Sequence, residues 1–293
     1  MHHSYPADQL RGFSQMLPGI IRILRPVNSI VAGLAAILAF FIATGTLVMT
    51  TLLLFPVVFC ITAAGNVVND WYDVKIDAVN RPDRPLPSGE VCMDTARLMV
   101  VLLFMAGIGF SFFTTPLCLI IAVINAVFLV LYAARLKRVA FMGNMTVSYL
   151  SASIFLFGGA LGGVVGIERI LPIAVITFLA MISRELLKTC EDLEGDKSSG
   201  ARTLPVIIGV RKTVILAMFF SIGAIITSVI PVIWWGWYYL AGIGIIDLVI
   251  FIGSAMAITC TSSSCVKRSK ATTSLKFGMF ASLVVFTLSA LFL

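Results

Sequence analysis

The sequence predicts an all-α membrane protein with nine membrane-spanning helices. Of its 293 residues, 59% are hydrophobic and 12% are charged, and the mean hydropathy is +1.05. A soluble domain carries roughly 25% charged residues, and a helix crosses the hydrocarbon core with about 17 to 25 apolar residues. Stretches of that length occur at 27–49, 51–70, 94–114, 116–134, 142–164, 169–188, 212–232, 237–258 and 274–293. We therefore expect a polytopic bundle.

The residues before the first apolar stretch predict a helix at the membrane surface. Met16–Leu24 gathers leucine and isoleucine on one side, beside Arg22 and Arg25, as in helices that lie in the interface. The order of basic start, short apolar core and small-residue cleavage site that marks a signal peptide does not occur. No linker divides the chain, so we interpret 1–293 as one membrane-embedded domain, with 1–26 as its cytoplasmic or interfacial N-terminal segment.

The basic residues predict the orientation in the cell membrane. Lys and Arg in short loops stay on the cytoplasmic side. Of the 21 such residues, all but Arg169 lie in the N-terminal segment or beside the loops that follow even-numbered helices. The N-terminus and these loops are expected to be cytoplasmic and the C-terminus external. The excess of Lys and Arg on the cytoplasmic side also accounts for the net charge of +7. Nucleic-acid binding is not expected, because no nucleic-acid-binding module is evident in the sequence.

Acidic residues are concentrated in two regions. Six of the 14 lie between Asp70 and Asp94, and five lie between Glu185 and Asp196. Helical spacing of four, three and four places the members of the first region on one stripe: Asn66, Asp70, Asp73 and Asp77. Spacing of three, four and four predicts the same for the second: Glu185, Lys188, Asp192 and Asp196. Charges at a membrane edge are costly, so paired stripes indicate a functional site.

A short repeat links the two regions. Arg84-Pro85-Leu86-Pro87 follows the first acidic stripe, and Arg202-Thr203-Leu204-Pro205 follows the second. The copies lie four helices apart and therefore keep the same orientation, as in parallel-repeat membrane proteins. We expect a pseudo-repeat of two halves around a central cavity, with a site between helices 2 and 6.

The oxygen-rich stripes indicate a hard metal ion. Mg²⁺ takes oxygen ligands and often binds through one or two carboxylates together with substrate phosphates. A diphosphate is the implied partner, and cations on the predicted cytoplasmic face could hold its other oxygens: Lys137, Arg84, Lys188, Arg202 and Arg25. Single loop acids such as Asp83 are better explained by ordinary salt bridges.

Other features favour structural roles. The six cysteines lie in or beside apolar helices without a C-x-x-C pair, and we interpret them as small apolar residues rather than as a disulfide framework. Asp247 stands alone in helix 8, where a hydrogen bond to a neighbouring Ser or Thr is favoured over a place in the cavity. Gly158-Gly159 and Gly162-Gly163 are explained by close helix packing.

The motifs resemble a known family. Asn66-x-x-Asn69-Asp70-x-x-Asp73-x-x-x-Asp77, the following Asn80–Gly89 loop, and Asp192-x-x-x-Asp196 are similar to the two aspartate-rich motifs of UbiA-type intramembrane prenyltransferases. The resemblance covers nearly the whole chain. It implies nine helices around a cavity, a prenyl diphosphate donor, a lipid-like acceptor and two Mg²⁺ ions.

Site residues follow from the resemblance position by position. It implies that the metal ligands are Asn66, Asp70, Asp73, Asp192 and Asp196. Tyr132 and Lys137 are similar to the family's tyrosine-lysine element after helix 4, although five residues separate them and some members have four. Lys137 is then an expected diphosphate ligand. The same interpretation assigns substrate binding to Lys188, Arg84, Arg202, Arg25, Arg22 and Asn144.

Within the family, Arg25–Ser29, Asn80–Gly89 and Gly143-Asn144 look most like archaeal members. That likeness implies transfer of a geranylgeranyl group to the free hydroxyl of geranylgeranylglyceryl phosphate, which forms the second ether bond of an archaeal lipid. Arg22, Arg25 or Arg81 is then expected to bind the acceptor phosphate.

Several alternatives stay open on the sequence. The same enzyme class could use an aromatic quinone precursor or a tetrapyrrole as acceptor. A metal-coupled transporter could use the stripes for binding alone, and a CDP-alcohol type transferase is a weaker candidate because its glycine-alanine-arginine spacing is missing. The prenyl chain length, the general base, the oligomeric state and the roles of Asp77, Asp247 and Glu185 are not decided by the sequence.

Overall fold

The computed structural model describes residues 16–198 and 200–292, and within them the protein is helical and contains no β-strand. A single isolated bridge, between Val139 and Arg202, is the exception to helix and loop in that part of the chain. Residues 16–24 form the predicted N-terminal helix. The start of the predicted N-terminal segment, with the basic residue Arg11, lies outside the described residues.

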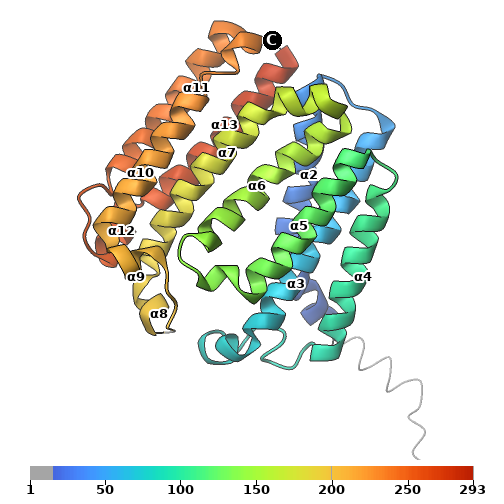
Figure 1. Cartoon of the computed structure of the whole chain (residues 1–293), viewed down its shortest axis with the longest axis vertical. Helices are drawn as coiled ribbons and strands as arrows, with labels where there is room; N and C mark the ends of the chain where they lie inside the picture. The colour runs from blue at the N-terminus through green and yellow to red at the C-terminus, as the bar shows by residue number, and fades with distance from the viewer. Residues whose placement is uncertain (1–15, 199, 293) are drawn as a thin grey trace, which may run out of the picture. The chain divides into compact units, whose positions relative to one another are not determined.

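Nine helices of the described chain are long and apolar enough to cross a membrane, which confirms the predicted fold class of a multi-pass membrane protein (Figure 1). They are α2 (Pro26–Thr44), α3 (Leu54–Asn80, after the 3₁₀ turn Met49–Leu53), α4 (Met93–Ser111), α5 (Pro116–Ala134), α6 (Met142–Leu161), α7 (Gly163–Glu191), α10 (Val210–Thr227), α11 (Val232–Ala255) and α13 (Ala271–Phe292). Shorter helices connect them: η2 (Leu136–Arg138), α8 (Leu193–Ser198), α9 (Leu204–Ile208) and α12 (Ser263–Ser269).

The helix bounds differ most from prediction at the first acidic region. We predicted that the second span ends at residue 70, but α3 continues to Asn80. Hydropathy reports where apolar side chains stop, whereas the backbone hydrogen bonds of a helix continue until a residue interrupts them. No proline or glycine lies between Asp70 and Asn80, and Pro82 disfavours helix at the residue before it. The first acidic stripe therefore lies on one continuous helix.

One compact unit comprises Met1–Ala36, as far as it is described, together with Met49–Ala134. Its helices approach closely at glycines: a Cβ added to Gly65 would meet the Leu129 side chain at 2.6 Å. A buried cluster joins Ile23 of the N-terminal helix to Val67 of α3 and to Leu86 of the loop after it. This cluster anchors both flanking segments against the helix that carries the first stripe.

The second unit comprises Ile37–Val48 and Arg135–Leu293. Helices α6 and α7 run side by side (Figure 1) and cross where Gly159 and Gly166 meet: a Cβ on Gly159 would lie 2.7 Å from the Gly166 carbonyl oxygen. This close approach matches the predicted role of the first glycine pair. A separate buried cluster unites Leu187 of α7 with Val214 of α10 and Leu275 of α13.

The two R-x-L-P segments share one anchoring device. Leu86 is 8% exposed and belongs to the buried cluster of the first unit. Leu204 packs against the buried cluster of the second unit. Each leucine therefore holds the polar loop that follows its acidic region, while the arginines of the two copies differ in their contacts, as described below.

Candidate active site at the two acidic helix ends

The first acidic stripe lies on the last turns of α3. Asp70 and Asp77 are buried, with 4% and 6% of their surface exposed, whereas Asn66 and Asp73 are half-buried. Because α3 is continuous from Leu54 to Asn80, the spacing of four, three and four places all four on one face. The predicted stripe is thus present as a structural feature.

Two arginines neutralise the buried aspartates of this stripe. Arg25 Nη2 lies 2.6 Å from Asp70 Oδ1, and Arg84 Nη1 lies 3.1 Å from the same oxygen. Arg84 Nη1 also lies 2.6 Å from Asp77 Oδ2. Burying a carboxylate is costly unless it is paired and hydrogen-bonded. The network therefore explains how two acidic groups persist within this helix end.

The backbone at Arg25 is shaped for this contact. Arg25 has φ +48°, a conformation that non-glycine residues seldom adopt and that clusters at functional sites. It separates the N-terminal helix, which ends at Leu24, from α2, which begins at Pro26. Proline is well suited to the first position of a helix and disfavours helix at the residue before it. The break turns the Arg25 side chain to Asp70.

The amide of Asn66 ties α3 to the same break. Asn66 Nδ2 donates to the Leu24 carbonyl oxygen at 3.2 Å and to Ser29 Oγ at 3.5 Å. Ser29 Oγ in turn donates to the Leu24 carbonyl at 3.1 Å. Ser29 is fully buried. We did not predict it as a site residue, although it lies in the Arg25–Ser29 segment that resembles archaeal family members.

Arg22 lies in a different ion pair. Its Nη1 is 2.7 Å from Glu90 Oε1, and its Nη2 donates to the Asp83 carbonyl oxygen at 2.7 Å. These contacts connect the N-terminal helix to the loop between α3 and α4. The structure therefore pairs Arg25 with the acidic stripe and Arg22 with the loop beside it.

The second acidic region is not the single helical stripe that we predicted. Helix α7 ends at Glu191, Asp192 is its C-terminal cap with φ −90° and ψ 2°, and α8 begins at Leu193. The Asp196 backbone N–H nevertheless donates to the Asp192 carbonyl at 3.0 Å. The helix is therefore interrupted, but the two aspartates stay one turn apart.

The two aspartates of this region differ in environment. Asp192 is exposed and Asp196 is half-buried. Burial raises the pKa of the Asp196 carboxyl above its ordinary value, and the neighbouring Asp192 carboxylate acts in the same direction. A bound cation would oppose both effects.

Other predicted residues lie around the end of α7. Lys188 is exposed, and Glu185 accepts a hydrogen bond from Arg184 Nη1 at 2.6 Å. Asn144 Nδ2 of α6 donates to Thr189 Oγ1 at 2.8 Å. Thr189 was not predicted, and its contact places Asn144 one turn before Asp192.

Lys137 lies in η2, just before α6. It is half-buried, and Gly143 packs against its backbone: a Cβ on Gly143 would meet the Lys137 Cα at 3.1 Å. Phe141 between them has φ +66°, another uncommon conformation for a non-glycine residue. Tyr132 is half-buried near the end of α5, in the other compact unit.

Arg202 does not repeat the contacts of Arg84. It is exposed and forms the backbone bridge with Val139, whereas Arg84 binds Asp70 and Asp77. The bridge holds the loop after α8 to the segment that follows η2. Of the two arginines of the internal repeat, one therefore binds the first stripe and the other is exposed.

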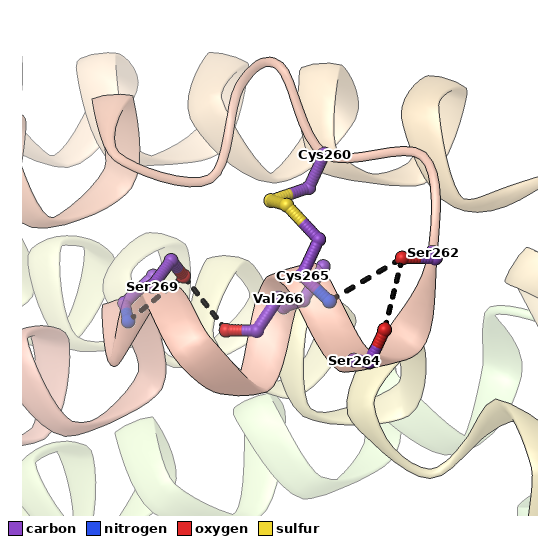
Figure 2. The surroundings of a disulfide bond; sticks show 7 residues. Cys260, Ser262, Ser264, Cys265, Val266 and Ser269 are labelled. Carbon is purple, nitrogen blue, oxygen red and sulfur yellow. Dashed lines mark hydrogen bonds between the residues drawn. A yellow bond between two sulfur atoms is a disulfide. The ribbon is translucent and has the colours of Figure 1, made fainter.

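One cysteine prediction is wrong. Cys260 and Cys265 form a disulfide in the segment between α11 and α13 (Figure 2). We had interpreted all six cysteines as small apolar residues because neither C-x-x-C spacing nor a dense framework is present. Pairing depends on how the turn between two cysteines folds, and a separation of five residues has no diagnostic spacing.

The side chains of both acidic regions suit Mg²⁺ chemically. The expected metal ligands all offer oxygen atoms, and the first stripe contains carboxylates whose charge needs compensation, which Arg25 and Arg84 supply in this structure. Among the described residues, no three His, Cys, Asp or Glu side chains converge as a ready-made metal cage.

Asp247 has the structural contact that we favoured. Ser228 Oγ, at the end of α10, donates to Asp247 Oδ2 at 2.6 Å, and Tyr239 OH donates to the Ser228 carbonyl at 2.6 Å. The three residues link the end of α10 to the interior of α11. Asp247 is therefore a hydrogen-bond acceptor between two helices.

In the part of the chain that the structure describes, nine apolar helices and two acidic, oxygen-rich helix ends define a multi-pass membrane protein. Comparison with known proteins specifies the class. The chain belongs to the UbiA prenyltransferase family, whose model matches residues 29–284. It is an enzyme of the prenyltransferase type.

Individual relatives are similar over nearly the full length. A digeranylgeranylglyceryl phosphate synthase of Methanoregula boonei is 57% identical over 275 residues, which cover 94% of this chain and 99% of the relative. A solved structure described as concerning digeranylgeranylglyceryl phosphate synthase in membranes has a TM-score of 0.86 and 34% identity, with coverage of 95% and 99%. A UbiA homologue from Archaeoglobus fulgidus, bound to GPP and Mg²⁺, shares the fold with a TM-score of 0.65 and 16% identity, with coverage of 92% and 99%.

Proposed function

We propose that this protein transfers a geranylgeranyl group from geranylgeranyl diphosphate to the free hydroxyl of geranylgeranylglyceryl phosphate. The observation that carries the proposal is the buried pairing of Asp70 with Arg25 and Arg84, a preformed polar site at the end of an apolar helix. The relatives at 57% and 53% identity, both digeranylgeranylglyceryl phosphate synthases, support this choice of substrates.

Both acidic regions are proposed to bind Mg²⁺, with two ions in all. The ligands would be Asn66, Asp70 and Asp73 from the first, and Asp192 and Asp196 from the second. Asn66 would ligate through Oδ1, because its Nδ2 donates to Leu24. When bound, Mg²⁺ would neutralise charge on the diphosphate and so make it a better leaving group.

Arg25 and Arg84 are proposed to exchange partners during the reaction. In the present structure their guanidinium groups compensate Asp70 and Asp77. Once a cation compensates the aspartates, the guanidinium N–H groups become available for diphosphate oxygens, which Arg binds well in bidentate fashion. Asp77 is then a residue that holds Arg84 rather than a metal ligand.

The remaining predicted residues are proposed to complete the diphosphate site. Lys137 would donate to the leaving diphosphate, supported by its half-buried position after the turn at Phe141. Lys188 and Arg202 are exposed and would supply further positive charge. Asn144, held by Thr189 near Asp192, is a candidate for orienting a ligand, and Tyr132 for lining the donor.

Charge balance defines the chemical step. The allylic C–O bond of the donor breaks, with its electron pair leaving on the diphosphate. The acceptor hydroxyl oxygen forms the new C–O bond and loses its proton, so the products are the diether, diphosphate and H⁺. Lys137 and the two arginines stabilise the negative charge that develops on the leaving group, and apolar helices keep water from the electrophilic carbon.

Arg22 is proposed to bind the acceptor phosphate. It pairs with Glu90 and is 47% exposed at its side chain, so an incoming phosphate can compete for it. Arg22→Gln should then raise the KM for geranylgeranylglyceryl phosphate and leave the KM for the donor unchanged. An aromatic acceptor carries no phosphate, and an unchanged acceptor KM would favour that alternative.

The topology is proposed to place the N-terminus and both acidic regions on the cytoplasmic side and the C-terminus outside. The distribution of all basic residues except Arg169 supports this orientation. The chain is proposed to act as a single membrane-embedded catalytic domain, although its helices form two compact units.

The direct test uses purified protein in detergent with Mg²⁺, radiolabelled geranylgeranyl diphosphate and geranylgeranylglyceryl phosphate. We expect a labelled diether from the wild type, abolished by EDTA and restored by added Mg²⁺. Asp73→Ala and Asp192→Ala should each lose the product, and Asp94→Ala, an acidic residue outside both stripes, should keep it. If the label were transferred to an added aromatic acid and not to the lipid, the acceptor would be aromatic and the proposed lipid acceptor would be wrong.

A further inference from the structure

The segment between α11 and α13 contacts the second acidic region through two hydroxyl groups. Ser263 Oγ, at the start of α12, donates to Glu194 Oε1 at 3.2 Å. Thr272 Oγ1, in the first turn of α13, donates to Glu191 Oε1 at 2.6 Å. Both contacts reach across more than 60 residues of sequence. The first contact joins α12 to α8, and the second joins α13 to the end of α7.

These two glutamates stand on either side of Asp192. Glu191 is the last residue of α7, Asp192 caps that helix, and Glu194 lies in α8. A helix end fixed only by its own backbone frays readily. The hydroxyl contacts therefore hold the chain before and after an exposed aspartate, at the point where the helix is interrupted.

Apolar packing supports the same contact. Val266 of α12 and Leu275 of α13 are fully buried in one cluster with Leu187 and Cys190 of α7. Helices α12 and α7 are in contact near α8 and α9 (Figure 1). The hydroxyls of Ser263 and Thr272 therefore belong to helices whose buried residues pack against α7.

The local geometry of the segment presents both hydroxyls. The Cys260–Cys265 disulfide closes the turn that precedes α12, and Ser262 Oγ caps α12 by accepting from the Cys265 N–H at 3.3 Å (Figure 2). At the other end, Lys270 adopts a left-handed conformation with φ +55°. This turn lets α13 begin at once, so that Thr272 lies beside Glu191.

We propose that Thr272 and Ser263 are positioning residues that hold Glu191 and Glu194, and through them fix the geometry of Asp192 and Asp196 for cation binding. The inference rests on the proposed role of these aspartates in the prenyl transfer. Both hydroxyls act through the glutamates that they contact. Partners behind the metal ligands typically affect metal affinity by about 10- to 100-fold, and small misplacements of reacting groups carry similar costs in rate.

The first test examines the metal-free protein in detergent by hydrogen–deuterium exchange. Thr272→Val should speed exchange in the peptide that spans 189–198, and Thr272→Ser, which keeps the hydroxyl, should restore the wild-type rate. Thr273→Val is the matched control, because Thr273 is an exposed neighbour on the same helix turn. Ser263→Ala should behave as Thr272→Val does, with the exposed Thr261 changed to Val as its control.

The second test measures Mn²⁺ binding by electron paramagnetic resonance and steady-state kinetics. Thr272→Val should weaken Mn²⁺ binding about tenfold, with a matching rise in the Mg²⁺ concentration that gives half-maximal rate. The KM for the lipid acceptor should stay unchanged. Unaltered exchange in 189–198, or unaltered Mn²⁺ affinity despite altered exchange, would overturn the proposal.

A purely structural role gives a different pattern. Loss of the hydroxyl would then accelerate exchange throughout α11 and α13 and lower Tm, without a specific change at 189–198, and this result also overturns the proposal. Exchange and Mn²⁺ binding require neither prenyl substrate. A wild type that fails to make the diether would therefore reject the proposed reaction, while these two measurements would still decide the positioning role.

Discussion

The Arg25 guanidinium lies 2.6 Å from the Asp70 carboxylate, across 45 positions of sequence. It reaches that carboxylate because the backbone at Arg25 breaks the helix between Leu24 and Pro26. The pair joins the N-terminal helix to the first acidic stripe. The N-terminal helix and a membrane-spanning helix are thereby joined by one ion pair.

Arg25→Gln should impair donor binding. The substitution removes a guanidinium that we expect to pass from Asp70 to the diphosphate, while Arg84 still compensates Asp70 at 3.1 Å. A charge-assisted bond to phosphate is worth about 1.5–3 kcal/mol, so the KM for geranylgeranyl diphosphate should rise about tenfold or more. Initial rates at varied donor and fixed acceptor measure this. A rise confined to the acceptor KM would instead assign Arg25 to the acceptor phosphate.

Arg84→Ala should destabilise the protein. Its side chain is 19% exposed and is shared by Asp70 and Asp77, whose side chains are 6% and 9% exposed. Removing one partner of a buried ion pair costs about 3 kcal/mol because the remaining charge is uncompensated. Thermal unfolding in detergent should show a lower Tm, and added Mg²⁺ should recover part of the loss by binding the aspartates.

The neighbouring Arg81→Ala is the control for that measurement, since Arg81 is exposed. Its Tm should match the wild type. If Arg84→Ala were as stable as Arg81→Ala, the ion-pair network would contribute nothing to folding, and the proposed exchange of Arg84 between aspartates and diphosphate would lose its structural basis.

Reduction of the Cys260–Cys265 disulfide should loosen the segment that contacts Glu191 and Glu194. A disulfide restricts the unfolded chain and typically contributes about 2 kcal/mol or more. We expect a reductant to lower Tm in the wild type and to have no effect on a Cys260→Ser, Cys265→Ser double variant. Cys92→Ser, which removes an exposed free thiol, controls for the other cysteines. Equal Tm with and without reductant would show that the bond does not support this segment.

Asp247→Leu should have a small effect on stability and none on kcat. Asp247 accepts a hydrogen bond from Ser228 Oγ, which also lies 2.7 Å from the Ile225 carbonyl and can donate there instead. Hydrogen bonds between membrane helices average about 0.6 kcal/mol, so Tm should fall only slightly. Asp247→Asn should match the wild type. A large loss of activity at unchanged Tm would move Asp247 from a structural role to the substrate cavity.

The first acidic stripe was predictable from the sequence, and the second only in part. In the first, helical spacing from Asn66 to Asp77 is kept because no residue interrupts α3 before Asn80. In the second, residues at helical spacing from Glu185 to Asp196 extend past the end of α7 at Glu191. Spacing reports the face of a residue only while the helix continues, and no proline marks this interruption.

Composition and charge determined that the protein is helical, crosses the membrane several times and carries two oxygen-rich regions. These follow from local quantities: the length of apolar stretches and the spacing of polar residues along a helix. The tertiary structure alone decided that Arg25 and Arg84 share Asp70, that Thr272 binds Glu191, and that Cys260 pairs with Cys265. Such contacts join residues distant in sequence or across a turn, and they depend on how helices pack and loops fold, which no local pattern encodes.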